Sequence, residues 1–312
     1  MPRKVILDVD PGIDDAVALA LALFDPRLEV EAVTAVAGNV GPDRATRNVQ
    51  AIVEQLDPPR LPRIGSASEP DHGVTVDRRQ LHGADGLANT NFEVAELHHV
   101  HPSDKLIADV IKTYPADVTV VCLGPLTNVA RALRRMPDLP EQIDSLLIMG
   151  GTLGCAGNVT AAADFNMYFD PESAREVFRT PCVKTLVPYD ITSQVLLTYD
   201  LLDQLPPEVT RVGRLLRRIL PHAYRAHHQI LGFEGVHVHD AVALMALTDP
   251  ELFSATPMYG DIETRGELTM GATIFDRRRN SEARPNLNLV TECDATAIRE
   301  RLTKRLMQLR EA

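Results

Sequence analysis

The sequence predicts an α/β fold in which a mostly parallel, Rossmann-like sheet is flanked by helices, with a few extra strands near the C-terminus. Two observations indicate this class. Short apolar runs alternate with helix-like segments from Lys4 to Val187, the pattern of βαβ units in a parallel sheet with both faces covered. After Pro206 the alternation gives way to helices and short strands. No linker, repeat or low-complexity tract is found, so we expect a single domain over residues 1–312.

The first two strand–helix units follow one another directly. Lys4–Leu7 and Val30–Ala37 are apolar runs with β-branched residues, which predicts two buried strands. Asp14–Phe24 is nearly all Ala, Val and Leu and reads as a helix. Pro42–Leu56 is predicted to be a second helix, because its apolar residues recur with helical spacing.

A long, weakly patterned connection spans Gly65–Pro102 and is rich in glycine and proline. Long irregular connections in compact domains are often functional. Beyond it the alternation resumes with three more expected strands and one helix. These are the strands Val118–Leu123, Leu146–Met149 and Lys184–Val187 and the helix Thr127–Arg135.

The C-terminal part is predicted to be mostly helical, with a short group of strands. Pro207–Leu231, Asp240–Leu247 and Ala295–Gln308 read as helices. The expected strands are Met258–Thr264, Met270–Phe275 and Asn286–Val290.

Composition excludes several classes of protein. At 312 residues the chain can bury a sizeable core without disulfides, and 45% apolar with 24% charged residues excludes disordered, collagen-like and membrane proteins. Lys and Arg number 32 against 43 Asp and Glu, a net charge of −11, so a nucleic acid polymer is not an expected partner. With no Trp, eight Phe and six Tyr, few residues could stack on a base.

Cysteine usage and the N-terminus indicate a cytoplasmic protein. None of the cysteines forms a CxxC pair, and we expect them to be reduced thiols. The first apolar run ends at Asp8, too early for a signal peptide, and no stretch reaches the ~18 apolar residues of a membrane span. We expect no membrane partner. The cysteines are Cys122, Cys155, Cys182 and Cys293.

Four carboxylates gather where the first strand ends. Asp8 and Asp10 are two apart, and Asp14 and Asp15 open the following helix. Ligands of open α/β sheets bind at the carboxyl ends of strands. Four such charges repel unless a cation lies among them, and oxygen ligands favour Ca²⁺ or Mg²⁺. The alternative is structural, because Asp14 alone could cap the helix and Asp15 alone would suit its dipole.

A series of motifs in a fixed order extends this pattern along residues 5–245. The segments are DVDPGIDDA (Asp8–Ala16), VAGNV (Val36–Val40), HGADG (His82–Gly86), LGPLTN (Leu123–Asn128), Met149-Gly150-Gly151, Gly157-Asn158, Asp164-Phe165-Asn166 and His239-Asp240. With this series the chain resembles the nucleoside hydrolases, the inosine-uridine-preferring N-ribohydrolase family, whose N-terminal signature is DxDPGxDDA.

The resemblance implies hydrolysis of the N-glycosidic bond of a small ribonucleoside to free base and ribose, dependent on Ca²⁺. It places the ion on Asp10, Asp15, Asp240 and the backbone carbonyl of Leu123, with Asp8 orienting the site. Asp10 would also be the general base that takes a proton from a metal-bound water. Direct attack by that water predicts inversion at the anomeric carbon. Family members are usually homodimers or homotetramers, and we expect the same here.

The same resemblance assigns the residues that hold the substrate. Those on the ribose are Asp14, Asn39, Met149, Asn158, Asp164, Asn166 and Asp240. On the base side it places His82 and His239, and His239 would protonate the leaving base. Each also has a structural alternative: Asp240 could be a helix cap, Met149 a core residue, and Asn39 and Asn158 turn residues beside glycines.

The chain departs from the family pattern mainly on the base side. Asp164 replaces a glutamate, His237 a proline, Leu231 a tyrosine of pyrimidine-preferring relatives, and His227 a polar partner. The preferred base therefore stays open. Candidates to line the base side are Tyr224, His227, His228, Phe165 and His237.

Two other functions remain as alternatives. One is a catalytically silent protein that binds ribose or a nucleoside, which the base-side departures allow. The other is a haloacid-dehalogenase-like phosphatase, which also begins with DxD but has no use for Asp14 and Asp15 and would not have Gly12 after the second Asp. A cluster of His98, His99 and His101 is interpreted as a surface loop rather than a metal site.

Overall fold

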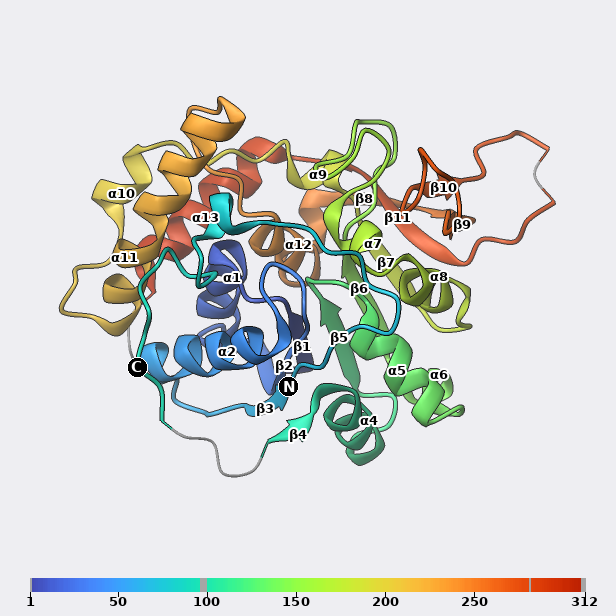
Figure 1. The fold of residues 1–312 in the computed structure, drawn as a ribbon, viewed down its shortest axis with the longest axis horizontal. Coiled ribbons are helices and arrows are strands. Elements are labelled where there is room, and N and C mark those ends of the chain that lie inside the picture. The colour runs from blue at the N-terminus through green and yellow to red at the C-terminus, as the bar shows by residue number, and fades with distance from the viewer. Residues whose placement is uncertain (1, 96–99, 281, 310–312) are drawn as a thin grey trace.

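A nine-stranded sheet forms the centre of the computed structural model, which describes residues 2–95, 100–280 and 282–309 (Figure 1). The strand order is β4-β3-β2-β1-β5-β6-β7-β11-β8, and each neighbouring pair is parallel except β11 and β8. The predicted mostly parallel sheet is confirmed. The strands are β1 (Arg3–Val9), β2 (Leu28–Ala35), β3 (Arg63–Ser66), β4 (His101–Pro102), β5 (Val118–Cys122), β6 (Ser145–Met149), β7 (Lys184–Val187), β8 (Phe253–Met258) and β11 (Leu287–Cys293).

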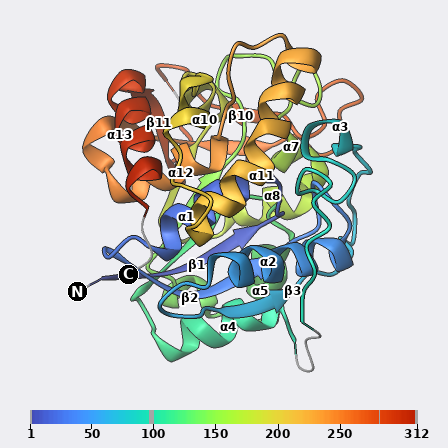
Figure 2. The ribbon, with the colours of Figure 1, turned by 90° about the vertical axis from the view of Figure 1, so that its left-hand side faces the viewer.

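Helices cover both faces of the sheet (Figures 1 and 2). Alternate residues of β1 enter different cores: Val5 and Leu7 pack with one helix layer and Ile6 with the other, as the two-residue period of a strand requires. The first layer contains α1 (Ile13–Leu23), α2 (Pro42–Leu56), α11 (Arg211–Ala226), α12 (His239–Thr248) and α13 (Ala295–Gln308). The second contains α4 (Ser103–Thr113), α5 (Thr127–Arg135) and α8 (Pro171–Arg179).

Short helical segments connect these elements. Several of them shape the edge of the sheet where the strands end. They are α3 (Arg79–His82), α6 (Leu139–Gln142), α7 (Phe165–Phe169), α9 (Tyr189–Thr192), α10 (Asp200–Gln204), the π-helix η1 (His227–Leu231) and the 3₁₀ turn η2 (Pro250–Leu252).

The C-terminal strands differ from the prediction. A single strand was expected over Met258–Thr264, and this is wrong, because Met258 ends β8 and Gly260 begins another strand. That strand, β9 (Gly260–Ile262), pairs with β10 (Thr273–Phe275) in a separate antiparallel sheet. The chain thus changes sheets at Tyr259, a step that periodicity over so few residues does not reveal.

Two helices that cover the second face, α4 and α8, and the strands β3 and β8 were not predicted. The described part of the connection Gly65–Pro102, which excludes residues 96–99, is mostly irregular, as expected, although α3 lies within it and β4 closes it. The helical prediction for Pro207–Leu231 corresponds to α11 followed by η1.

The strand order reverses between β1 and β5, and this positions the site. From β1 the chain builds the sheet outward through β2, β3 and β4, then returns to the other side of β1 to form β5. Connections leave the two strands in opposite directions, which opens a crevice at their carboxyl ends, the usual ligand position in such sheets. Asp10 and Leu123 directly follow these two strands.

No helix in the described ranges is long and apolar enough to cross a membrane.

Candidate active site

Two adjoining cavities occupy the crevice at the carboxyl ends of the strands. The inner cavity collects most of the residues that the sequence singled out for the ion and the ribose. Its lining residues are Asp10, Asp14, Asn39, Arg78, Leu123, Met149, Asn158, Asp164, Phe165, Asn166, His239 and Asp240. Residues from β1 to α12 thus meet at one place although they are up to 230 positions apart in the chain.

Asp10 is held in a tight backbone cradle. Its Oδ2 accepts the backbone N–H of Asn39 at 2.9 Å, and its carbonyl accepts Asn39 Nδ2 at 3.0 Å. A Cβ on Gly124 would lie 2.5 Å from Asp10 Oδ1, and one on Gly38 would overlap Oδ2. Both glycines are therefore needed for the carboxylate to lie where it does, and Asp10 is only 2% exposed.

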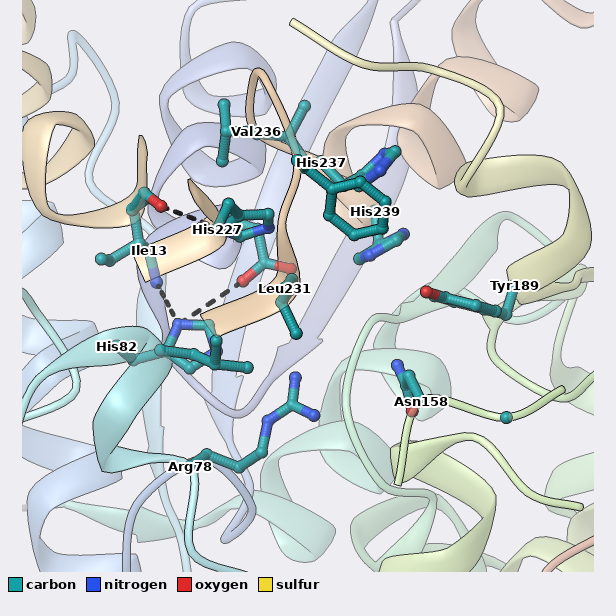
Figure 3. A pocket seen from close by; sticks show the side chains of 16 residues that line it. Ile13, Arg78, His82, Asn158, Tyr189, His227, Leu231, Val236, His237 and His239 are labelled. Carbon is teal, nitrogen blue, oxygen red and sulfur yellow. Dashed lines mark hydrogen bonds and ion pairs between the residues drawn. The ribbon is translucent and has the colours of Figure 1, made fainter. Parts of the chain in front are cut away.

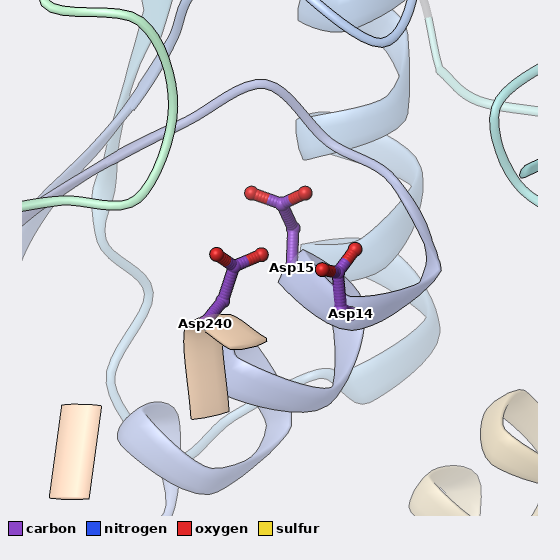
Figure 4. Close-up of side chains that lie close together, drawn as sticks. All are labelled: Asp14, Asp15 and Asp240. Atoms are coloured by element: carbon purple, nitrogen blue, oxygen red, sulfur yellow. The ribbon is translucent and has the colours of Figure 1, made fainter. Parts of the chain in front are cut away.

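Three carboxylates converge at the start of α1 and α12, as Figure 4 shows. Asp14, Asp15 and Asp240 each offer an oxygen, and these oxygens lie within 4.8 Å of one another. Asp14 and Asp15 come from the first turn of α1, and Asp240 from the first turn of α12. This triad contains two of the predicted carboxylate ligands, with Asp14 as its third member instead of Asp10.

Helix capping, the structural alternative for these acids, explains only part of their arrangement. Asp15 Oδ2 accepts the N–H of Gly12 at 2.8 Å, so Asp15 does help to cap α1. Asp240 is not the cap residue of α12, because Val238 takes that position. Capping therefore accounts for one oxygen of Asp15 and leaves the convergence of Asp14 and Asp240 unexplained.

Oxygen atoms without partners indicate a group that would bind among them. Asp14 Oδ1, Asp15 Oδ1 and Asn39 Oδ1 are buried and have no hydrogen-bond donor. Buried acceptors are normally satisfied, and these are all hard oxygen donors with no thiol or imidazole in the triad. The residues present thus fit a hard divalent cation such as Ca²⁺.

The electrostatics of the site point the same way. Burial raises the pKa of Asp15 to about 7, and the charge of Asp14 adds to this shift. Burial likewise raises the pKa of Asp10 and of Asp240 well above the usual range, with further increases from neighbouring carboxylates. Without a cation these acids cannot all be ionised together at neutral pH, whereas a bound divalent ion would stabilise the ionised forms.

Asp8 lies behind the inner cavity and does not line it. Its Oδ1 accepts Thr34 Oγ1 at 2.6 Å and Asn128 Nδ2 at 2.8 Å, and its Oδ2 has no partner. Burial raises its pKa to about 7. These bonds join β1 to β2 and α5, which is compatible with the expected role of Asp8 in orienting the site.

The amide side chains are oriented by the backbone around them. Asn158 Oδ1 accepts the N–H of Phe165 at 2.8 Å, which leaves the Asn158 amide nitrogen to donate into the cavity. Asn166 Nδ2 donates to the carbonyls of Leu123 at 2.7 Å and Met149 at 3.1 Å. The predicted carbonyl ligand, Leu123, therefore faces this cavity and has Asn166 as its present partner.

Asp164 caps the short helix α7 and is largely occupied there. Its Oδ1 accepts the N–H of Gly151 at 2.6 Å, and its Oδ2 that of Asn166 at 3.1 Å. Burial raises its pKa to about 6 in spite of these bonds. Both oxygens of the Asp164 carboxylate are thus bound to backbone groups.

The outer cavity, of about 290 Å³, shares Asp14, Arg78, Asn158 and His239 with the inner one and is shown in Figure 3. Its size is close to the lower end for small-molecule pockets. Imidazoles and apolar side chains make up most of its wall. The lining residues are Ile13, Asp14, Arg78, Leu81, His82, Gly157, Asn158, Tyr189, Ala223, His227, Leu231, Phe233, Val236, His237, Val238 and His239.

His239 stands where the two cavities meet, because it lines both. Its Nδ1 is 2.9 Å from Thr192 Oγ1, and its ring stacks on His237 with 5.5 Å between centroids. The ring of Tyr189 lies 5.1 Å away on another side. These contacts fix the imidazole and leave Nε2 as the ring nitrogen not engaged by Thr192.

His82 lies at the opposite wall. Its Nδ1 accepts the N–H of Ile13 at 3.2 Å, an arrangement that requires a neutral ring with the proton on Nε2. Burial lowers its pKa well below the usual value, and the charge of Arg78 lowers it further. His82 Nε2 is buried and has no partner, so it can donate a hydrogen bond to a ligand in the pocket.

The candidates for the base side divide into two groups. His227 and His237 line the outer cavity and Phe165 lines the inner one, whereas Tyr224 and His228 line neither, so their placement was wrong. Tyr224 is buried in the core, where its hydroxyl donates to the carbonyl of Thr198 at 2.8 Å. His228 faces outward, with Nδ1 3.3 Å from Glu234.

Several lining residues were missed, among them Arg78, Tyr189 and Phe233. Arg78 lies in the long irregular connection, where no periodicity draws attention to one side chain. Tyr189 begins the short helix α9 just after β7, so its position after a parallel strand was a usable signal. Of the histidine cluster, His101 is exposed in β4, and His98 and His99 lie outside the described residues.

Comparison with known proteins shows which family this chain belongs to. Residues 5–300 match the family model described as inosine-uridine preferring nucleoside hydrolase. The non-specific ribonucleoside hydrolase RihC of Escherichia coli is 35% identical over 301 residues, covering 96% of this chain and 97% of the relative. A purine-preferring ribonucleoside hydrolase from Gardnerella vaginalis superimposes with a TM-score of 0.91 at 27% identity, covering 98% and 99% of the two chains. A plant nucleoside hydrolase gives 0.90 at 28% identity, covering 99% and 100%.

Proposed function

Because this chain belongs to the inosine-uridine preferring nucleoside hydrolase family and is a nucleoside hydrolase, we propose that it cleaves ribonucleosides to free base and ribose by direct attack of water, with Ca²⁺ as cofactor. The observation that carries this mechanism is the pair of adjoining cavities. The inner one gathers carboxylates and amides suited to a ribose, and the outer one offers imidazoles and apolar walls suited to a base.

The calcium ion would be held by Asp10, Asp15, Asp240 and the carbonyl of Leu123. Buried oxygen atoms without donors, and the 4.8 Å convergence of Asp15 and Asp240 with Asp14, support a cation in this place. When bound, the ion would make water easier to deprotonate and would hold the vicinal hydroxyls of the ribose.

Asp10 is the proposed general base. Its carboxylate is fixed between Gly38, Gly124 and the Asn39 N–H and faces the inner cavity, so it can accept a proton from water approaching the anomeric carbon. A base held this firmly loses little entropy on reaching the reactive geometry. Because water attacks directly, the ribose released from a β-nucleoside should be the α-anomer first.

The ribose is the part of the substrate that becomes cationic. Cleavage of a glycosidic bond proceeds through a state with oxocarbenium character, which nearby carboxylates stabilise. Asp10, Asp14 and Asp240 line the cavity that would hold it. The amide nitrogen of Asn158 can donate a hydrogen bond to a ribose hydroxyl, because its amide oxygen is already bound to the N–H of Phe165. The Asn39 amide oxygen has no partner and can accept a hydrogen bond from a ribose hydroxyl.

His239 is the proposed proton donor to the leaving base. Thr192 and the stacked His237 fix its ring at the junction of the cavities, where the bond between ribose and base would lie. A donor is needed there because the departing base nitrogen keeps the bonding electron pair.

We also propose a location and an oligomeric state for the enzyme. The four cysteines are free thiols, which suits a reducing compartment, and we propose a cytoplasmic location. We propose a homodimer or homotetramer, because members of the family usually form one of these. Light scattering on the purified protein would measure the oligomeric state.

The direct test is a substrate panel. Purified protein with Ca²⁺ is incubated with inosine, adenosine, guanosine, uridine and cytidine, and free base and reducing sugar are measured. We expect turnover of at least one of them. Binding without any turnover would instead support the catalytically silent alternative, and release of inorganic phosphate from sugar phosphates alone would support a phosphatase.

The cofactor has its own test. Calorimetric titration of chelator-treated protein with Ca²⁺ should give one site, and thermal unfolding should shift upward by the stabilisation that ligand binding confers, about 2.7 kcal/mol at 100-fold excess over Kd. Asp240→Asn should weaken that titration. An exposed carboxylate variant, Asp43→Asn, should leave it unchanged.

A further inference from the structure

Arg78 is the residue of this site that the proposed mechanism does not use. It lines both cavities and lies just before α3, in the irregular connection. We propose that Arg78 stabilises the negative charge of the departing base and thereby selects bases that carry carbonyl oxygens. The inference rests on the proposed function and adds a substrate preference to it.

The guanidinium is held without being paired. Its Cζ stands 4.8 Å from the centroid of the Phe165 ring, a distance typical of cation–π contact. Its Nε is buried without a hydrogen-bond partner, and no ion pair of Arg78 is found within the described ranges. In Figure 3 the side chain points into the pocket between His82 and Asn158.

The neighbouring Arg79 is an ordinary surface arginine and serves as a comparison for Arg78. Arg79 Nη2 lies 2.6 Å from Asp77 Oδ2, and its side chain is 68% exposed. Arg78 has no such carboxylate partner, although Asp10, Asp14 and Asp164 all sense its charge. A guanidinium offers five donors and no acceptor, so the group that completes this site must accept hydrogen bonds.

Charge is divided between the two cavities. Four carboxylates line the inner cavity beside Arg78, whereas the outer cavity has one carboxylate, Asp14, and Arg78 is its one permanent cation. His227 and His237 do not replace it, because burial lowers the pKa of His227 to about 4 and also lowers the pKa of His237. Arg78 is therefore the permanent positive charge of the outer cavity, beside the proton that His239 is proposed to deliver, and Asp14 is the one carboxylate that opposes it.

This division matches the charge that develops in the reaction. As the bond from C1′ to the base nitrogen breaks, its electron pair moves onto the base, while water adds a hydroxyl to C1′ and gives its proton to Asp10. The ribose end becomes positive and the base end negative until the base is protonated. Carboxylates at one end and a guanidinium at the other stabilise both partial charges.

The donor-only chemistry of Arg78 implies a preference. Hypoxanthine, guanine and uracil place carbonyl oxygens on the ring, and these carry part of the developing charge and accept hydrogen bonds. Adenine instead presents an exocyclic amino group, which cannot accept from a guanidinium. Inosine and uridine should thus depend on Arg78 more than adenosine does.

The test compares kcat/KM for four substrates: inosine, uridine, adenosine and p-nitrophenyl riboside, whose leaving group needs no help. Arg78→Gln should reduce turnover of inosine and uridine by about 100-fold and that of p-nitrophenyl riboside by about threefold or less. Arg78→Lys, which keeps the charge, should recover part of the loss. Arg79→Gln is the matched control and should behave as wild type.

Three results would overturn the inference while leaving the proposed function intact. They are unchanged inosine turnover in Arg78→Gln, an equal loss on p-nitrophenyl riboside, and a loss on inosine that disappears with 5′-deoxyinosine, which would assign Arg78 to the 5′-hydroxyl. A wild-type protein inactive on every nucleoside would instead defeat the proposed function and the inference together. Thermal midpoints of the variants show whether folding is intact.

Discussion

The two cavities of the site are built in different ways. The inner cavity rests on residues that follow β1, β5 and β6 and on the first turns of α1 and α12. Its side chains are tied to backbone groups, as Asp10 is to Asn39 and Asn166 to Leu123. The outer cavity is closed by the end of α11, the π-helix η1 and the segment that follows it.

The two regions also differ in exposure. Asp10 and Asp240 are 2% and 3% exposed, whereas Leu231 and Phe233 at the mouth of the outer cavity are 44% and 36% exposed. A rigid, buried and acidic half suits the ribose and the ion, which every ribonucleoside presents alike. An open half of imidazoles and apolar groups suits the base, which varies. From this difference we infer that the inner cavity determines the rate of bond cleavage and the outer cavity determines which base is preferred.

The largest effect should come from the inner cavity. Asp10→Asn keeps the shape and an oxygen at this position but cannot accept a proton, so kcat should fall by about 10³-fold or more for every substrate. Asp43→Asn, on the surface of α2, is the control. Activity near that of wild type would remove Asp10 from the mechanism.

A nearly equal test uses the backbone cradle. The added methyl of Gly38→Ala would overlap the Asp10 carboxylate, and Gly41→Ala, three residues on, meets no atom within 4 Å. Because a displacement of about 1 Å can cost 10²-fold, Gly38→Ala should reduce kcat by roughly that factor while Gly41→Ala does not. Equal activities would mean that the position of Asp10 matters less than its presence.

A substitution at the outer mouth should do less. Leu231→Ala shortens a side chain that is 44% exposed, so we expect KM to rise by less than about tenfold and kcat to stay close to wild type. The ratio of inosine to uridine turnover should change more than either rate alone. A fall in kcat equal to that of Gly38→Ala would contradict the proposed division between the halves.

The smallest effect concerns stability and pH. Burial lowers the pKa of His227 from 6.5 in the unfolded chain to about 4. Between these values the unfolded chain binds a proton that the folded chain does not, so stability falls as the pH drops through this window. His227→Gln should flatten that fall in urea unfolding, and His228→Gln, with an exposed ring, serves as the comparison. An unchanged slope would argue that His227 is solvated.

Sequence reasoning reached the inner half because its chemistry is local. The DVDPGIDDA segment brings Asp8, Asp10, Asp14 and Asp15 to one strand end, and a parallel strand order then collects the remaining motifs at the same edge. The sequence did not indicate that Asp14 would converge with Asp15 and Asp240. The position of Asp10 depends on Gly38 and Gly124, which follow β2 and β5 and lie far from Asp10 in the sequence.

The outer half was less predictable for a physical reason. Arg78 and Phe233 lie in irregular segments, where no helical or strand pattern of apolar residues predicts which side chains face the cavity. Tyr224 and His227 are three positions apart on successive turns, yet only His227 reaches the cavity, because Tyr224 turns into the core toward Thr198. The end of β8 was also unpredictable from a repeating pattern, because the chain leaves β8 at Met258 and enters another sheet at Gly260.

The division between the halves is tested most directly by one pair of variants on two substrates. Inosine and p-nitrophenyl riboside share the ribose and differ in how much help the leaving group needs. We predict that Asp10→Asn loses kcat/KM on both in parallel, whereas His239→Ala loses about 10²-fold or more on inosine and little on p-nitrophenyl riboside. Parallel losses in both variants, or a selective loss in Asp10→Asn, would contradict this account.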